Sequence, residues 1–379
     1  MLKTLISISL TFFLIITFPI MILSSFMGFI SETIATSATC IAFLSMYFGF
    51  AFLLFKIRLD KKLFLKISIS LFALSLISTV ISVSLIPSED TNNKFGLKSV
   101  YTSDNKPIFC LITKLIREID QVKFGSTLIP FADEFIDKEK GARLKNYIIE
   151  AYTDMQSYSD FVNVGSVTHH ALFEILGAKF DSGHIYVYTP EHDETEKLPV
   201  ILFLHGSLGN FKVYPWVLKQ FADKYKYAIV VPTHGEGNWD LNNGVSVIER
   251  ARDYCVNQSN MDENRIILVG LSNGGLGITR TAMKNPEYYQ GLIYISSILE
   301  SNLISSDKFL NNLKEKPILV IHGTKDERIP KAMMDDAIDI LNANQLNSKI
   351  KYFENEDHFL FLSKKDELLD LMYNWIEGK

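Results

Sequence analysis

The chain has 379 residues, a formal net charge of −5 and a hydrophobic fraction of 47%. Its apolar residues are concentrated before Pro87, and the part that follows holds 32 basic and 41 acidic residues, a net charge of about −9. Phosphate binding needs clustered Lys and Arg, so this balance argues against a nucleic-acid surface. The sequence has no Cys or His spacing typical of a metal site.

Residues 1–88 are predicted to form a membrane anchor of three transmembrane helices. Three uncharged stretches are each long enough to cross the ~30 Å hydrocarbon core as a helix; they cover residues 4–31, 33–55 and 67–88. A cleaved signal peptide is an alternative for the first stretch, but no Ala-x-Ala site follows it. Buried helices of a soluble domain are a weaker alternative for all three.

Basic residues beside these stretches predict their orientation. The link between the second and third stretches is rich in positive charge, with Lys56, Arg58, Lys61, Lys62 and Lys66, whereas the first link holds only Glu32. By the positive-inside rule the basic link is cytoplasmic. We therefore expect a multi-pass protein of the cell membrane with a cytoplasmic N-terminus and an extracytoplasmic C-terminal part.

Residues 89–165 are expected to form a linker and helical segment whose role the sequence does not define. Residues 87–93 are typical of a polar linker. Helical patterns cover residues 108–119 and 142–152. This segment could act as a lid, as a support near the membrane, or as an N-terminal extension of a sheet.

Residues 166–379 are predicted to form one α/β domain. Its β-rich runs are mostly apolar throughout, which is typical of parallel strands covered on both faces; they cover residues 197–204, 227–231, 265–269, 292–296 and 317–321. Helical patterns follow at residues 215–225, 247–256, 276–285, 331–341 and 364–377. This alternation predicts a doubly wound, mostly parallel sheet. Residues 184–188 alternate in polarity and are expected to form an antiparallel edge strand.

Residues with useful chemistry follow several of these strands, where ligands bind in such sheets. The pentapeptide Gly270-Leu271-Ser272-Asn273-Gly274 lies between a strand and a helical pattern. Its glycines allow the strained turn that exposes a serine hydroxyl above a sheet. Asp326 and His358 follow later in the chain, also at predicted strand ends. The pentapeptide alone is a weak indication, and these partners strengthen it.

The order Ser272, Asp326, His358 resembles that of the α/β-hydrolase superfamily. The chain is most similar to capless esterases and to the catalytic domains of prolyl-oligopeptidase-like serine peptidases. The motifs that carry this resemblance are His205-Gly206, Gly-Leu-Ser-Asn-Gly-Gly, His-Gly-Thr-Lys-Asp and Asp-His-Phe, within residues 173–377. Only residues 299–316 separate the fourth run from the fifth, so we expect no large cap there.

Chemistry and the resemblance together assign the expected roles. A serine hydroxyl needs a base, which His358 would supply to Ser272. Asp326 would accept the other imidazole N–H and fix the tautomer. The backbone N–H groups of Asn273 and Ser207 are expected to form the oxyanion hole, with Leu208 as the alternative second donor.

Further residues near these motifs are candidates for a substrate pocket, for shaping turns or for a disulfide. Candidates for lining a substrate pocket are Leu208, Tyr214, His234 and Trp239, although core packing is the commoner fate of such aromatic residues. His205 and His322 are expected to shape their turns. We expect Cys255 to be a buried free thiol, and a disulfide with Cys110 is the alternative.

These observations predict a membrane-anchored serine hydrolase that cleaves a carboxylic ester through an acyl-serine intermediate, without a metal or other cofactor. Its substrate would be a small-molecule, lipid or peptide acyl compound. The alternatives are a serine peptidase of the prolyl-oligopeptidase-like type and an acyltransferase that acts on an envelope lipid or sugar. A catalytically silent binding protein is the alternative outside enzymes.

Overall fold

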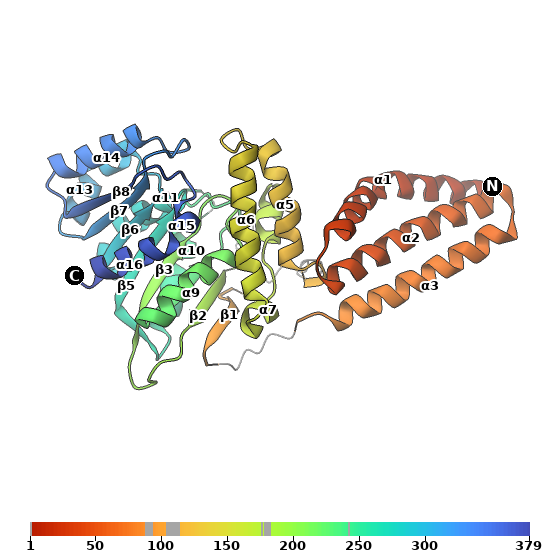
Figure 1. The fold of residues 1–379 in the computed structure, drawn as a ribbon, viewed down its shortest axis with the longest axis horizontal. Helices are drawn as coiled ribbons and strands as arrows, with labels where there is room; N and C mark the ends of the chain where they lie inside the picture. The colour runs from red at the N-terminus through yellow and green to blue at the C-terminus, as the bar shows by residue number, and fades with distance from the viewer. Residues whose placement is uncertain (1, 88–93, 104–113, 176, 178–182, 242) are drawn as a thin grey trace. The chain divides into compact units, whose positions relative to one another are not determined.

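The computed structural model describes residues 2–87, 94–103, 114–175, 177, 183–241 and 243–379 (Figure 1). The chain forms two compact units. The first unit contains residues 1–87 and 111–133, and the second contains residues 88–110 and 134–379. The segment between the candidate anchor and the α/β domain is therefore divided between the two units.

Three long helices make up most of the first unit. They are α1 (Leu2–Ile30), α2 (Ile34–Leu59) and α3 (Lys62–Ser84), and each is long and apolar enough to cross a membrane. Thr33 caps α2 by accepting a hydrogen bond from the Thr36 N–H, and Asp60 ends it in a left-handed conformation with φ 53°. The prediction of three long apolar helices is confirmed, with α3 starting earlier than expected.

A fourth helix, α5 (Glu118–Ala132), also belongs to the first unit. The sequence pattern had placed a helix at residues 108–119. Residues 108–113 lie outside the described part of the chain, and α5 starts only at Glu118. Glu118 and Asp120 in its first turn are favourably placed at the positive end of the helix dipole.

An eight-stranded sheet forms the centre of the second unit, in the order β1-β2-β4-β3-β5-β6-β7-β8. The strands are β1 (Gly96–Tyr101), β2 (His184–Thr189), β3 (Leu198–Leu204), β4 (Ala228–Pro232), β5 (Met261–Leu271), β6 (Gly291–Ile295), β7 (Ile318–Gly323) and β8 (Ser348–Phe353). The pairs β1–β2 and β2–β4 are antiparallel, and all other pairs are parallel. The predicted mostly parallel sheet is confirmed.

The expectation that residues 184–188 form an edge strand is wrong. They lie in β2, which pairs with both β1 and β4 and is buried along its whole length. The edge is β1, from the segment that the sequence left undefined, and it extends the sheet at that side. The opposite edge, β8, is half exposed and carries alternating lysines, which discourage edge-to-edge pairing with another chain.

Helices cover both faces of the sheet. On one face the buried core includes side chains from α10 (Gly244–Val256), α11 (Gly274–Lys284) and α14 (Lys331–Ala343). The other face carries α9 (Val213–Tyr225) and α16 (Lys365–Ile376), and α9 contacts α6 (Lys138–Met155). Short helices complete the unit: α7 (Ser159–Asn163), α8 (His169–Ile175), α12 (Ser301–Ile304), α13 (Asp307–Leu313), α15 (Leu360–Ser363) and a 3-10 turn at Pro286–Tyr288.

The connection at residues 299–316 is short, and Cys255 is buried in the same unit. Only α12 and α13 occupy residues 299–316, so that connection holds no large cap. Cys255 is fully buried and free, with its Sγ donating to the Ala251 carbonyl at 3.1 Å. Cys110 lies outside the described residues.

Buried histidines form a cluster where β2, the end of β4 and α8 meet. Both His170 Nδ1 and His184 Nδ1 lie within hydrogen-bonding distance of Thr233 Oγ1, at 3.2 and 3.0 Å. His169 packs against His170, with 4.4 Å between ring centroids. Burial lowers the pKa of His169 to about 4 and that of His170 to about 3, and it holds the pKa of His184 well below 6.5.

This cluster predicts that the folded protein loses stability in mild acid. Below pH 6.5 the unfolded chain binds protons that the buried rings do not, so stability falls as the pH drops toward the folded pKa values. The expected loss is roughly 1 kcal/mol per ring for each pH unit below 6.5. The melting temperature of the detergent-solubilised full chain should fall steeply between pH 7.5 and 5, and His170→Asn should reduce that slope. Equal melting temperatures at the two pH values would contradict this.

Candidate active site

The candidate nucleophile Ser272 lies on a sharp turn between β5 and α11. Its φ is 53°, in the left-handed region that costs a residue with a side chain about 1–2 kcal/mol. Gly274 is required at this turn, because a Cβ there would lie 2.3 Å from the Leu204 carbonyl oxygen. The glycine lets α11 start against β3, and the serine hydroxyl is left beyond the carboxyl end of the sheet.

The neighbouring strand β6 holds this strained turn in place. The Ser272 N–H donates to the Ile295 carbonyl at 3.1 Å, and the Ile298 N–H donates to the Ser272 carbonyl at 3.1 Å. The buried Ser297 hydroxyl donates to the Gly270 carbonyl at 2.6 Å. Both polar groups of the Ser272 backbone are thus hydrogen-bonded, which over-determines its conformation. Sequence reasoning missed Ser297, since nothing in its pattern distinguishes it from a loop serine.

His358 and Asp326 lie in line with the Ser272 hydroxyl. His358 Nε2 is 3.0 Å from Ser272 Oγ, and His358 Nδ1 is 2.8 Å from Asp326 Oδ2. With the Nδ1 proton donated to the carboxylate, Nε2 is left as an acceptor for the serine hydroxyl. Asp326 follows β7 and His358 follows β8, so the three side chains reach one point from three different strand ends.

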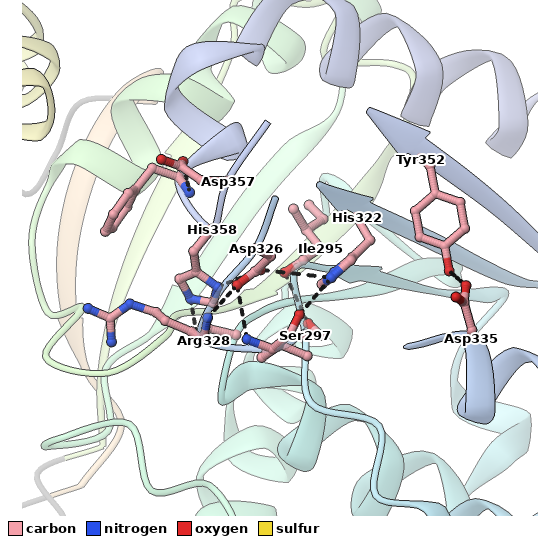
Figure 2. A network of polar contacts seen from close by, with 12 residues as sticks. Ile295, Ser297, His322, Asp326, Arg328, Asp335, Tyr352, Asp357 and His358 are labelled. Atoms are coloured by element: carbon pink, nitrogen blue, oxygen red, sulfur yellow. Dashed lines mark hydrogen bonds and ion pairs between the residues drawn. The ribbon is translucent and has the colours of Figure 1, made fainter. Parts of the chain in front are cut away.

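Figure 2 shows the Asp326 carboxylate surrounded by its partners. Its Oδ1 accepts from the N–H groups of Arg328 and Ile329, both at 3.0 Å. Burial alone would raise the pKa of Asp326, but the hydrogen bond and charge of His358 and the Ile329 N–H together hold it below its usual range. Asp326 is therefore an anion with a fixed orientation at neutral pH.

His322 lies beside the Asp326 carboxylate but is not one of the three aligned side chains. It is fully buried, and its Nε2 donates to the Ile329 carbonyl at 2.9 Å. Burial lowers its pKa, although the Asp326 charge opposes the shift. The ring supports the turn that carries Asp326, in the role that the sequence suggested for it.

A second loop, after β3, comes close to the nucleophile. A Cβ at Gly206 would lie 3.0 Å from the Ser272 Cβ, so glycine allows this approach. The Leu208 N–H already donates to the Glu236 carbonyl at 2.9 Å. Within the described part of the chain, the backbone N–H groups of Ser207 and Asn273 donate to no carbonyl in these turns. The geometry therefore favours Ser207 over Leu208 as the second oxyanion donor.

The side chains of these two residues also contact each other. Asn273 Nδ2 donates to Ser207 Oγ at 2.8 Å. This hydrogen bond joins the turn after β5 to the loop after β3, and it fixes the spacing between the two backbone donors. A tetrahedral oxyanion needs donors that are aligned before it forms, so the bond has a direct bearing on the chemistry that this site can support.

Two of the four residues expected to line a substrate pocket lie in the core instead. Trp239 is fully buried and His234 is 2% exposed. The Trp239 indole N–H donates to the His205 carbonyl at 2.8 Å, and the His234 N–H donates to His205 Nε2 at 3.0 Å. Both residues support the loop after β3, so the expectation that they contact a substrate is corrected.

His205 is the centre of that support. Its Nδ1 donates to the Gly206 carbonyl at 2.7 Å, and burial lowers its pKa to about 4, which keeps the ring neutral. This is the turn-shaping role expected of it. Of the remaining pocket candidates, Leu208 is 46% exposed, and Tyr214 is half-buried against the rings of Phe203 and Phe361.

Helix α6 adds contacts that the sequence did not reveal. Lys140 forms an ion pair of 2.5 Å with Glu327, which follows Asp326 in the chain. Arg143 forms an ion pair with Asp357, which precedes His358. One helix from the undefined segment thus contacts both the loop that carries Asp326 and the loop that carries His358. The partners of these two ion pairs are 187 and 214 residues apart in the chain, so a local sequence pattern cannot predict either pair.

No group of three or more metal-ligating side chains occurs among the residues that the structure describes. The chemistry available at the site is that of a serine hydroxyl, an oriented imidazole, a carboxylate and two backbone donors. Such a set can transfer an acyl group by way of a covalent serine adduct.

The mostly parallel sheet and the strained turn after β5 give this unit a fold of the α/β-hydrolase type. Within that class, residues 239–376 match the phospholipase/carboxylesterase family model. A search of curated proteins gives no match.

Solved structures with a similar fold include three hydrolases. A thermostable esterase is 17% identical, with 51% of this chain and 60% of that chain covered and a TM-score of 0.43. The fluorophosphonate-binding serine hydrolase F of Staphylococcus aureus is 15% identical, with 51% and 92% covered and a TM-score of 0.44. The acylaminoacyl peptidase of Pyrococcus horikoshii is 18% identical, with 51% and 39% covered and a TM-score of 0.40.

The contact between Asn273 and Ser207 predicts a coupled effect on turnover. Removing either side chain deletes one hydrogen bond, worth about 0.5–1.5 kcal/mol, and should lower kcat about 3-fold to 10-fold with little change in KM. Asn273→Ala and Ser207→Ala should therefore have similar effects, and the double variant should be no slower than the slower single variant. Steady-state kinetics of the three variants measures this coupling, and effects that multiply in the double variant would contradict it.

Proposed function

We propose that this protein is a membrane-anchored serine hydrolase that cleaves a carboxylic ester through an acyl group on Ser272. The observation that carries the proposal is the alignment of Ser272 Oγ, the His358 imidazole and the Asp326 carboxylate at distances of 3.0 and 2.8 Å. The strained backbone at Ser272 supports it, because strain of this kind persists where a function requires it.

In the proposed reaction His358 Nε2 takes the Ser272 proton as Oγ attacks the ester carbonyl. The tetrahedral oxyanion accepts hydrogen bonds from the Ser207 and Asn273 N–H groups, each such donor being worth on the order of 3 kcal/mol of barrier. His358 then gives its proton to the leaving alcohol, which breaks the C–O bond and leaves the acyl-serine. A water molecule, activated by the same imidazole, releases the acid and restores the serine.

Asp326 serves both halves of this reaction. Its fixed anionic carboxylate holds the Nδ1–H tautomer of His358 and stabilises the imidazolium that forms in each proton transfer. The two N–H donors to Asp326 Oδ1 keep it in place. Every step uses groups of this chain and water.

An ester is the proposed substrate class, as a small-molecule, lipid or peptide acyl compound. The match of residues 239–376 to a phospholipase/carboxylesterase family model supports an ester over an amide. The short connection at residues 299–316 leaves the strand ends on that side without a large cap, which is consistent with substrates of varied size.

The full-length protein should hydrolyse short p-nitrophenyl esters and react with a fluorophosphonate probe. Ser272→Ala should abolish both, because it removes the hydroxyl that lies 3.0 Å from His358 Nε2. Asp326→Asn should lower kcat about 10³-fold to 10⁴-fold by favouring the wrong imidazole tautomer. Ser305→Ala, at an exposed helix end, is the matched control and should leave both activities unchanged.

Other results of the same assays would redirect the proposal. Probe labelling that survives Ser272→Ala would exclude Ser272 as the nucleophile. Faster cleavage of dipeptidyl amides than of esters would indicate a serine peptidase. Transfer of the acyl group to an added alcohol, at the expense of hydrolysis, would indicate an acyltransferase.

The second part of the proposal is the location of the catalytic unit. Three apolar helices of 29, 26 and 23 residues support insertion into a bilayer, which needs about 20 residues per helix. The positive charges at the end of α2 and the start of α3 favour a cytoplasmic position for that connection. We infer a cytoplasmic N-terminus and an extracytoplasmic active site.

A membrane-impermeant maleimide tests this orientation. In a Cys110→Ser background, Met333→Cys on the exposed side of α14 should react in intact cells. Lys61→Cys, between α2 and α3, should react only after the cells are permeabilised. The reverse pattern would mean that the active site faces the cytoplasm.

A further inference from the structure

Helix α5 is attached to one end of the three long helices by a buried carboxylate. Asp120, in its first turn, is fully buried. It accepts hydrogen bonds from the Glu32 N–H at 2.7 Å and from Thr33 Oγ1 at 2.5 Å, both in the turn between α1 and α2. Lys123 also forms an ion pair with Glu32. A buried carboxylate with two donors fixes the start of α5 against that turn.

Arg117, just before α5, attaches it to the other two long helices at the same end. Its N–H donates to Thr36 Oγ1, in the first turn of α2, at 2.9 Å. Its guanidinium donates to the Leu85 carbonyl, directly after α3, at 2.7 Å. The end of α1, the start of α2 and the end of α3 therefore all lie at one level, and α5 starts there. Figure 1 shows α5 at this end of the three long helices, running at a steep angle to them.

One side of α5 is packed against this end of the bundle. Ile119 and Val122 are buried on it, and so is Ser126 one turn further on. The Phe124 ring contacts Phe26 of α1 edge to face, with 5.6 Å between the ring centroids. Away from these contacts, the side of the helix that holds Leu128 and Phe131 is uncovered.

The uncovered side of α5 is apolar. Leu128 is 45% exposed and Phe131, three residues further on, is 83% exposed. From Phe124 to Ala132 the helix has no charged residue. A helix that faces water normally carries charged residues on its outer side. An exposed phenylalanine on the uncharged second half of a helix, at the level where apolar spans end, suits contact with a membrane interface.

We propose that α5 is an interfacial membrane helix, with Leu128 and Phe131 in contact with the lipid bilayer at the end of the bundle where α3 ends. Lipid is the proposed occupant of this face because α5 starts at the level where the apolar helices α1–α3 end, and its residues from Phe124 to Ala132 carry no charge. The inference rests on the proposed insertion of those helices into a membrane. It assigns to the middle of the undefined segment, residues 89–165, a membrane contact that adds to the three spans.

Depth-dependent fluorescence quenching tests this inference in full-length protein reconstituted into liposomes. Phe131→Trp and Leu128→Trp each add one indole to the three native tryptophans, whose signal is subtracted with the parent protein. Lipids brominated near the glycerol end of the acyl chains should quench the added emission more strongly than lipids brominated near the chain terminus. Because both changes place a large apolar side chain where another stood on an exposed face, folding should be retained, and esterase activity checks this.

Two control positions separate the possible failures. Leu76→Trp, on the exposed side of α3, should be quenched most by lipids brominated deep in the chain, and Met333→Trp on α14 should not be quenched. If Leu76→Trp is unquenched, the proposed insertion itself fails. If Leu76→Trp is quenched while Phe131→Trp is not, only the interfacial helix is overturned. A blue-shifted, unquenched Phe131→Trp would show that protein covers this face, and a red-shifted one that water does.

Discussion

The left-handed backbone at Ser272 is the constraint on which the rest of the catalytic unit depends. It costs about 1–2 kcal/mol and is held by hydrogen bonds from both sides, to Ile295 and from Ile298. These bonds exist only if β5 and β6 pair in parallel and end at the same level. The sheet therefore positions the serine, and the packing of α11 against β3 through Gly274 prevents the turn from relaxing.

The loops around this turn are fixed by polar contacts between distant parts of the chain. Neutral His205 and buried Trp239 set the conformation of the loop after β3, which brings Gly206 to the nucleophile. On the other side, α6 is paired with residues adjacent to Asp326 and His358. Exposed ion pairs contribute little to stability. Their effect here is on the position of the two loops, since each pair restrains a residue next to a member of the proposed triad.

The sequence predicted the features that local pattern encodes. Apolar runs with helices between them gave the parallel sheet, and strand ends with characteristic residues gave Ser272, Asp326 and His358 as neighbours. The sequence did not predict the position of residues that depends on contacts with parts of the chain far away in sequence. β1 and β8 form the two edges of the sheet and are not among the predicted strands, and β1 pairs with β2 from 88 residues further along the chain. Trp239 looked like a pocket residue because an indole can serve a core or a surface, and only its bond to the His205 carbonyl decides between them.

The central claim is that Ser272 carries the acyl group during turnover. Acid quenching of the full-length enzyme during hydrolysis of a slowly released p-nitrophenyl ester, followed by peptide mapping by mass spectrometry, tests this directly. The proposed mechanism predicts the acyl mass on the peptide that contains Ser272 and on no other peptide. An acyl group on a different residue, or steady hydrolysis with no acylated peptide, would contradict it.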